Sequence, residues 1–381
     1  MSPSRDARPQ PPVQKDGTAH NMPPEEAPAF LLASAHRRTS HVPVWFMRQA
    51  GRSLPEYRKL RGNGSILDVI RSPEIAAEMT LQPVRRYGVD AAILYSDIMV
   101  PPAAIGYGVE VTQGRGPYVP SPFRSPADLG RLRALEPEVD IPFVIETVQH
   151  VAGELCHIGV PLIGFAGGPF TVASYLIEGG SSKDYVRTKS LMRSEPVVFA
   201  ELLSRLGTLA LDFLKAQVSA GASAVQIFDS WAGTLSASEY KSYVLPSVTA
   251  LMEGLAPLRV PRIYFAVSAS HLLDLVASSG CDIISIDWRM SLRLARKQLE
   301  SHGMHQALQG NLDPTCCLAP WEVLEKEAMA TLEAGQGIGH IFNLGHGVLP
   351  DTDPAMLERL VELIHSVPLD TLVGRTSDDP R

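Results

Sequence analysis

Short apolar runs rich in β-branched residues alternate with longer amphipathic stretches along most of this chain. Such runs are typical of buried strands, whereas the apolar spacing between them is typical of helices. This alternation constrains the fold strongly, because strands joined by helical crossovers pair in parallel. The predicted strands are Val42–Phe46, Ala91–Ser96, Leu162–Ala166, Ala224–Phe228, Arg262–Val267, Ile283–Asp287, Gln306–Gln309 and Ile341–Leu344.

Eight strands with crossovers predict a single-domain α/β fold, a (β/α)8 TIM barrel whose active-site cleft lies at the carboxyl ends of the strands. An open doubly wound sheet is the alternative, but no Gly-x-Gly-x-x-Gly motif follows an early strand. We assign residues 29–368 to the barrel, 1–28 to a disordered N-terminal extension and 369–381 to a frayed tail. The predicted helices include Pro73–Tyr87, Pro196–Ala220, Ser238–Leu255, His271–Ser279, Ser291–Ser301 and Trp321–Ala334.

The charge balance and the cysteine content narrow the class of protein. A net charge of −7 argues against a general nucleic-acid surface, so an anionic ligand needs a local positive site. Four cysteines are too few for a disulfide framework, and we expect reduced thiols in a cytoplasmic protein. We find no apolar stretch long enough to span a bilayer and no signal-peptide core.

Two arginines follow the first predicted strand and form a candidate anion receptor. Arg48 and Arg52 lie on either side of Ala50 and Gly51, and the glycine allows backbone amides to point toward the same ligand. Ordinary exposed arginines are the alternative interpretation. In a barrel, this loop meets the polar residues that end the other strands, which include Asp97, Tyr175, Ser230, Asp287, Asn311, Asp313 and His346.

Several of these segments resemble a known family. The stretch Met47–Arg58 is similar to the N-terminal signature of the uroporphyrinogen decarboxylase family, and Gly164–Thr171 with Tyr175 and Glu178–Gly180 is similar to its second signature. Smaller matches follow in the family's order, so that the resemblance extends from about residue 43 to about residue 365. They are Tyr95–Asp97, Phe228–Ser230, Gln309–Pro314 and Asn343–Gly347.

The resemblance implies decarboxylation of the four acetates of uroporphyrinogen III to methyl groups, giving coproporphyrinogen III, without metal or cofactor. It implies a tetrapyrrole substrate, a homodimer and no nucleic-acid or membrane partner. Catalysis is assigned to Asp97 and Arg48, with the proton donor left open. The implied substrate-binding residues are Arg48, Gln49, Ala50, Gly51, Arg52, Asp97, Tyr175, Ser230 and His346, and the apolar pocket wall is Phe165, Phe170 and Phe228.

Each of these residues also has a purely structural interpretation. Asp97 and Ser230 are residue types that cap helices and turns, and Tyr175 is compatible with the edge of a core. His346 is either a structural turn residue or a hydrogen-bond donor to a carboxylate, and in the second case its imidazole could move protons near neutral pH. Ser268 stands where the family often has a lysine, and Trp231 stands where some members have histidine, which makes a catalytic side chain at either position doubtful.

Two other functions remain as alternatives, and two segments are expected to lie near the mouth. A zinc-dependent methyltransferase of the same superfamily needs a late His-x-Cys pair, which this sequence lacks. A non-catalytic tetrapyrrole carrier is compatible with all the motifs. The glycine- and proline-rich segment Gly106–Arg124 is expected to be a loop or small hairpin over the mouth, and Gly179–Val186 either a lid or a plain surface loop.

Overall fold

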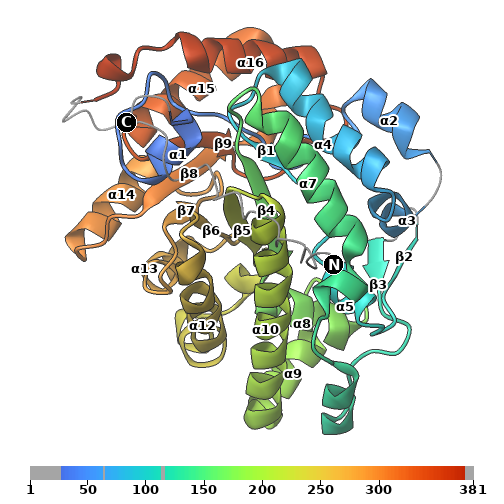
Figure 1. Cartoon of the computed structure of the whole chain (residues 1–381). Coiled ribbons are helices and arrows are strands. Elements are labelled where there is room, and N and C mark those ends of the chain that lie inside the picture. The colour runs from blue at the N-terminus through green and yellow to red at the C-terminus, as the bar shows by residue number, and fades with distance from the viewer. Residues whose placement is uncertain (1–26, 63–64, 113–115, 374–381) are drawn as a thin grey trace, which may run out of the picture.

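A curled parallel sheet of seven strands lies at the centre of the protein (Figure 1). The structure is a computed structural model, and it describes residues 27–62, 65–112 and 116–373. Most predicted strands are confirmed within two residues at each end, and β5 has the predicted bounds. In sheet order the strands are β1 (Ala92–Ile93), β4 (Leu162–Gly167), β5 (Ala224–Phe228), β6 (Arg262–Phe265), β7 (Ile283–Ser285), β8 (Ala307–Leu312) and β9 (His340–Leu344).

The first predicted strand, Val42–Phe46, does not form a strand of the sheet. It makes one isolated parallel bridge, between Val44 and Phe342. The reason is local: Pro43 has no N–H to donate, and the N–H of Val44 binds the Asp90 carboxylate at 2.7 Å instead of a strand. The segment still lies between the two sheet edges, because Phe342 N donates to Pro43 O at 2.8 Å and Asp90 N donates to Val44 O at 2.8 Å.

Helices form an outer layer around the sheet (Figure 1). Four of them begin with proline, whose fixed φ and missing N–H suit the first helical position. The bounds predicted for α4 and α10 are confirmed. The outer helices are α4 (Pro73–Tyr87), α7 (Pro142–Cys156), α10 (Pro196–Ala220), α12 (Leu245–Leu255), α13 (Leu273–Ala277), α14 (Leu292–Ser301), α15 (Trp321–Gly335) and α16 (Pro354–Ser366).

Two predicted helices are interrupted. The predicted helix Ser238–Leu255 consists of a short turn, α11 (Ala237–Glu239), one π-helical turn and α12. The predicted helix His271–Ser279 begins as a 3-10 turn and continues as α13. The remaining helices are α1 (Ala29–Ser34), α2 (Pro55–Arg61), α3 (Ile66–Ile70), α5 (Val100–Ala104), α6 (Pro137–Asp140), α8 (Pro169–Glu178) and α9 (Val186–Ser194).

The segment 106–124, expected to be a loop or small hairpin, is joined to the segment 179–186, expected to be a lid or a surface loop. Strands β2 (Glu110–Thr112) and β3 (Gly116–Tyr118) form the hairpin. Just after it, Val119 N donates to Gly179 O at 3.0 Å. Further along the segment 179–186, the Tyr185 ring is buried and packs against Trp231 at a tilt of 55°, with ring centroids 5.2 Å apart. The segment after α8 is therefore anchored at both ends.

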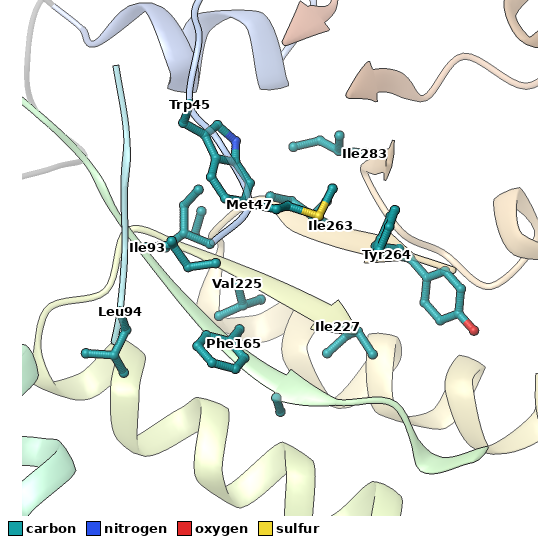
Figure 2. Close-up of a cluster of buried hydrophobic side chains, with 14 of the residues drawn as sticks. Trp45, Met47, Ile93, Leu94, Phe165, Val225, Ile227, Ile263, Tyr264 and Ile283 are labelled. Atoms are coloured by element: carbon teal, nitrogen blue, oxygen red, sulfur yellow. The ribbon is translucent and has the colours of Figure 1, made fainter. Parts of the chain in front are cut away.

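The inner face of the sheet combines an apolar cluster with a polar chain. Figure 2 shows Trp45 and Met47 gathered with Ile93, Phe165 and Ile263. This cluster fixes the segment before the arginine loop against the sheet, so the loop has a defined place above it.

The polar chain crosses the same interior through hydrogen bonds between side chains, and it ends at Gln226, whose Nε2 has no partner among the described residues. Trp45 Nε1 donates to Gln309 Oε1 at 3.0 Å. Gln309 Nε2 donates in turn to Gln226 Oε1 at 3.1 Å and to Ser285 Oγ at 3.0 Å. A buried polar group is costly without a partner, so these bonds favour one arrangement of β5, β7 and β8.

The ends of the chain differ from their predicted limits where the structure describes them. Residues 1–26 and 374–381 of the predicted extension and tail lie outside the described residues. Within the predicted tail, Leu369 and Leu372 are buried, which holds that segment against the domain. Among the described residues, no helix is long and apolar enough to cross a membrane.

Candidate functional site

The arginine loop leaves the sheet in an unusual backbone conformation. Arg48 has φ +59°, in the left-handed region that costs a non-glycine residue free energy. A Cβ on Gly347 would lie 2.4 Å from Arg48 Cδ, so glycine there lets the arginine stem pass closely. The loops after residue 46 and after β9 are further joined by the bond from Val348 N to Met47 O at 2.8 Å. Arg48 itself is exposed.

The three residues after Arg48 do not share one role. The backbone N–H groups of Ala50 and Gly51 make no hydrogen bond among the described residues, which leaves them free for a ligand. Gln49, in contrast, is fully buried and its N–H donates to Phe46 O at 3.0 Å. Its side chain accepts from Phe46 N at 3.1 Å and donates to Ala91 O at 3.2 Å. The expectation that Gln49 offers an amide to the substrate is therefore corrected.

Replacing Gln49 by alanine is expected to destabilise the fold rather than to act on the site directly. The substitution leaves Phe46 N–H and Ala91 C=O buried without their side-chain partner, at about 1–3 kcal/mol each. Urea unfolding followed by circular dichroism measures the loss, with Gln149→Ala, at an exposed position of α7, as the control. An unfolding free energy equal to that of the unmodified protein would show that the two hydrogen bonds of the Gln49 side chain contribute nothing to stability.

Asp97 follows β1 and lies within electrostatic range of Arg48. Burial raises the pKa of its carboxyl group, and the Met99 N–H and the Arg48 guanidinium oppose that rise. The Met99 N–H donates to Oδ1 at 2.8 Å, so the local turn-capping interpretation is correct for this oxygen. The other oxygen, Oδ2, has no hydrogen-bond donor among the described residues and remains available to a ligand.

Tyr175 lies on α8 near the same carboxylate. Burial, with a contribution from the Asp97 charge, raises the pKa of its phenol to about 12, so the hydroxyl is a neutral donor at ordinary pH. Its ring stacks on Trp231 with centroids 4.2 Å apart, which fixes its direction. Trp231 directly follows Ser230 after β5, and this contact brings the ends of two neighbouring strands together.

A fully buried carboxylate, Asp229, holds α8 in place. It accepts from Thr171 N at 2.8 Å, from Thr171 Oγ1 at 2.7 Å and from the Tyr264 hydroxyl at 3.0 Å. Burial raises the pKa of this carboxyl group. Asp229 therefore positions the helix that carries Tyr175 and has no exposed surface for a ligand.

His346 follows β9 and lies near the arginine loop. Burial and the nearby Arg48 and Arg289 guanidiniums lower the pKa of its imidazole to about 4, and Asp287 partly offsets this effect. In the free protein we therefore expect this ring to titrate below the neutral range expected from the sequence, because burial and positive neighbours disfavour a further positive charge. A bound carboxylate would reverse that balance.

The protonation of His346 can be measured directly. We expect a midpoint near 4 in the free protein by NMR of the imidazole C–H groups, assigned by comparison with His346→Gln. Because the folded pKa lies below the unfolded value of about 6.5, the ring's contribution to stability is complete above that pH and is lost as pH falls toward 4. A midpoint of about 6.5 or above would contradict the described surroundings.

The remaining predicted residues divide between the site and the core. The Ser230 hydroxyl caps no helix and has no partner among the described residues, which leaves it free at the end of β5. Phe165 and Phe228 meet edge to face at 5.3 Å near the carboxyl ends of their strands. Phe170 is completely buried and belongs to the core, so its assignment to the wall is corrected. Arg52 is exposed.

Three residues were missed in the sequence although the strand pattern contained the signal. Phe265 lies on the inner face of β6, edge to face with Phe228 and 6.2 Å from the His346 ring. Trp288 and Arg289 follow Asp287 in the loop after β7, just as Asp97 and Ser230 lie in the loops after β1 and β5. Inner-face alternation and strand-end position were sufficient to select them.

Potential metal ligands gather away from this mouth. Within the described ranges, one group of three His, Cys, Asp or Glu side chains has ligand atoms in reach of one another, namely His41, Asp90 and His365. Asp90 precedes β1, so the group lies at the amino ends of the strands. Each histidine donates Nε2 to a different Asp90 oxygen at 2.8 Å.

Comparison with known proteins identifies the family. The family model described as uroporphyrinogen decarboxylase (URO-D) matches residues 25–367. A uroporphyrinogen decarboxylase from Salinispora tropica is 51% identical over 90% of this chain and 91% of its own length. One from Geobacillus kaustophilus is 48% identical, covering 88% and 96%.

Solved structures with low sequence identity share the fold. A methyltransferase from Methanosarcina mazei aligns with a TM-score of 0.74 at 21% identity, covering 88% of this chain and 96% of the other. A B12-independent methionine synthase from Shewanella aligns with a TM-score of 0.52 at 12% identity, covering 78% and 89%. These alignments support a TIM-barrel-like fold, and the family match over most of the chain shows that the chain belongs to the uroporphyrinogen decarboxylase family.

Proposed function

We propose that this protein decarboxylates the acetate side chains of uroporphyrinogen at the mouth formed by the arginine loop and the strand ends. The carrying observation is that one cation, Arg48, is close enough to shift the pKa values of Asp97, Tyr175 and His346 together. Residues from four separate segments therefore lie near one another, and we take the space between them as the site. That space contains cations for carboxylates, one carboxylate for pyrrole N–H groups and apolar rings for a macrocycle.

The reaction needs an electron sink, and the substrate provides one. Protonation of a pyrrole ring carbon gives an iminium cation, which accepts the electron pair of the C–C bond as CO2 leaves. A proton then adds to the exocyclic carbon to make the methyl group, and the ring proton is lost again. Each complete decarboxylation thus replaces one carboxylate by one proton, and no outside oxidant or reductant is consumed.

In this proposal Asp97 stabilises the cation as it forms. Its free Oδ2 accepts pyrrole N–H groups, and its negative charge lies at a partly buried position, where electrostatic stabilisation is stronger than in open water. Arg48, Arg52 and the free N–H groups of Ala50 and Gly51 bind acetates and propionates. Tyr175 and Ser230 donate neutral hydrogen bonds, and His346 becomes protonated when a carboxylate approaches.

We further infer that segment 42–46 occupies the position of the eighth strand and closes the barrel. It bonds to β9 on one side and to Asp90, just before β1, on the other. Closure explains how the loop after this segment is held opposite Asp97.

A homodimer and a cytoplasmic location are part of the same proposal, and light scattering of the purified protein tests the dimer.

The thiol groups favour decarboxylation over zinc-dependent methyl transfer. Among the described residues, no cysteine joins a group of three or more potential ligands. Two of the four cysteines, Cys281 and Cys317, are also buried away from solvent.

One assay separates the three functions. The protein is incubated with uroporphyrinogen without oxygen, and the products are oxidised and separated by carboxylate number. We expect the eight-carboxylate substrate to be converted to the four-carboxylate product, with a chelator having no effect. Binding without conversion would favour the carrier, and methyl transfer that requires zinc would favour the methyltransferase.

A further inference from the structure

Arg289, at the end of β7, has the features of a built carboxylate receptor although it lies outside both family signatures. Its side chain is 46% exposed. Nη1 donates to Asp287 Oδ2 at 3.0 Å, and among the described residues no partner occupies the other guanidinium N–H groups. The guanidinium also lies over the Trp288 ring, 4.0 Å from its centroid. One edge of the cation is therefore anchored, and the other is available.

The anchor itself is rigid. Asp287 is nearly fully buried, and it accepts from Ser268 N and from Arg289 N, the latter at 2.9 Å. Asn311 Nδ2 donates to Asp287 O at 2.8 Å. The loop is thus fixed from β6, β7 and β8, and a ligand that binds Arg289 does not have to order it first, which lowers the entropic cost of binding.

Arg289 also faces the proposed site rather than open surface. It is close enough to His346 to lower the pKa of that imidazole, as Arg48 does from its own loop. A Cβ on Gly345 would lie 2.4 Å from Trp288 N, so the loops that carry His346 and Arg289 are in direct contact. Arg48 and Arg289 therefore flank the neutral His346 ring, and the two guanidiniums make this rim positively charged.

We infer that Arg289 is a substrate-binding residue that holds one carboxylate of the tetrapyrrole at this rim, in addition to the contacts of the arginine loop. The inference rests on the proposed function, because it takes the polycarboxylate as its ligand. A guanidinium with one free edge presents two parallel N–H groups, the geometry that matches a carboxylate. The receptor acts in binding, since Arg289 lies at the rim and Asp97 provides the charge at the reacting ring.

The test compares Arg289→Gln with Arg205→Gln. Arg205 is a matched control: it is 41% exposed, pairs with Glu201 at 2.7 Å on α10, and its replacement changes the net charge equally. We expect Arg289→Gln to raise KM for uroporphyrinogen about tenfold with kcat within about twofold, since a charge-assisted pair is lost. Arg289→Lys keeps the positive charge but loses the paired N–H groups of the guanidinium. Its KM is expected to lie between those of Arg289→Gln and Arg205→Gln. KM unchanged, or a loss of kcat alone, would overturn the inference.

Binding measured without turnover separates this inference from the proposed reaction. The fluorescence of oxidised uroporphyrin and of coproporphyrin, with eight and four carboxylates, is titrated with each variant. Weaker binding of both ligands to Arg289→Gln identifies a propionate contact, and weaker binding of uroporphyrin alone identifies an acetate contact. Equal binding to both glutamine variants contradicts the role of Arg289 even if the protein is an active decarboxylase. A tenfold loss supports it even if no CO2 is released.

Discussion

Replacing Asp97 by asparagine is expected to lower kcat for uroporphyrinogen by about 10²–10³-fold while the protein stays folded. The amide keeps an oxygen that accepts the Met99 N–H, so the turn is preserved. What is lost is the negative charge beside the developing iminium. Removing one preorganised electrostatic partner from other active sites costs about this much. Anaerobic initial rates at saturating substrate measure the change.

The same substitution is expected to maintain or raise the melting temperature. Burial raises the pKa of Asp97, which means that ionising this carboxyl costs free energy in the folded state. A neutral amide avoids that cost, so activity falls while stability does not, as is common where a site is arranged for function. Differential scanning calorimetry above the usual carboxyl pKa gives the comparison.

Asp353→Asn is the control for Asp97→Asn. Asp353 caps α16 and accepts from Ala355 N at 3.0 Å, the same residue spacing as between Asp97 and Met99. Asparagine caps as well as aspartate does, so neither rate nor stability is expected to change. If Asp97→Asn behaved like Asp353→Asn, Asp97 would be only a turn-capping residue.

The fold was largely predictable because its signals are local. β5, α4 and α10 have the predicted bounds, since an apolar run or an N-terminal proline marks each of them. The segment 42–46 was not predictable as an isolated bridge. Its strand-like composition is overridden by one missing N–H at Pro43 and by the distant Asp90, which binds the next N–H.

The site was predictable by residue type and strand position, but side-chain direction was not. Asp97 and Asp229 both end a strand in similar motifs, yet one keeps a free oxygen and the other is saturated by Thr171 and Tyr264. Gln49 adjoins Arg48 and points the opposite way, into the core. Such differences depend on contacts between segments far apart in sequence, which periodicity does not encode.

Arg48 combines strain with charge, and its replacement should have the second large effect. A left-handed backbone at a non-glycine residue costs about 1–3 kcal/mol, and here the surroundings hold it. We expect Arg48→Lys to lower kcat/KM about 10²-fold and Arg48→Gln about 10³-fold. Lysine keeps the charge and loses the paired N–H groups, whereas glutamine loses both.

Arg259→Lys separates the guanidinium effect from the backbone effect. Arg259 is an exposed arginine with φ +55°, located before β6 and therefore at the amino ends of the strands. Any general consequence of lysine in a left-handed conformation appears at both positions, but only Arg48 lies near Asp97 and His346. Anaerobic kcat/KM for the two lysine variants, together with the His346 midpoint, decides between the effects. In Arg48→Gln the titration midpoint of His346 should rise above about 4, because one of the two guanidiniums that lower its pKa is absent. An unchanged midpoint with unchanged kcat/KM would place Arg48 outside the site and remove the observation on which the proposed function depends.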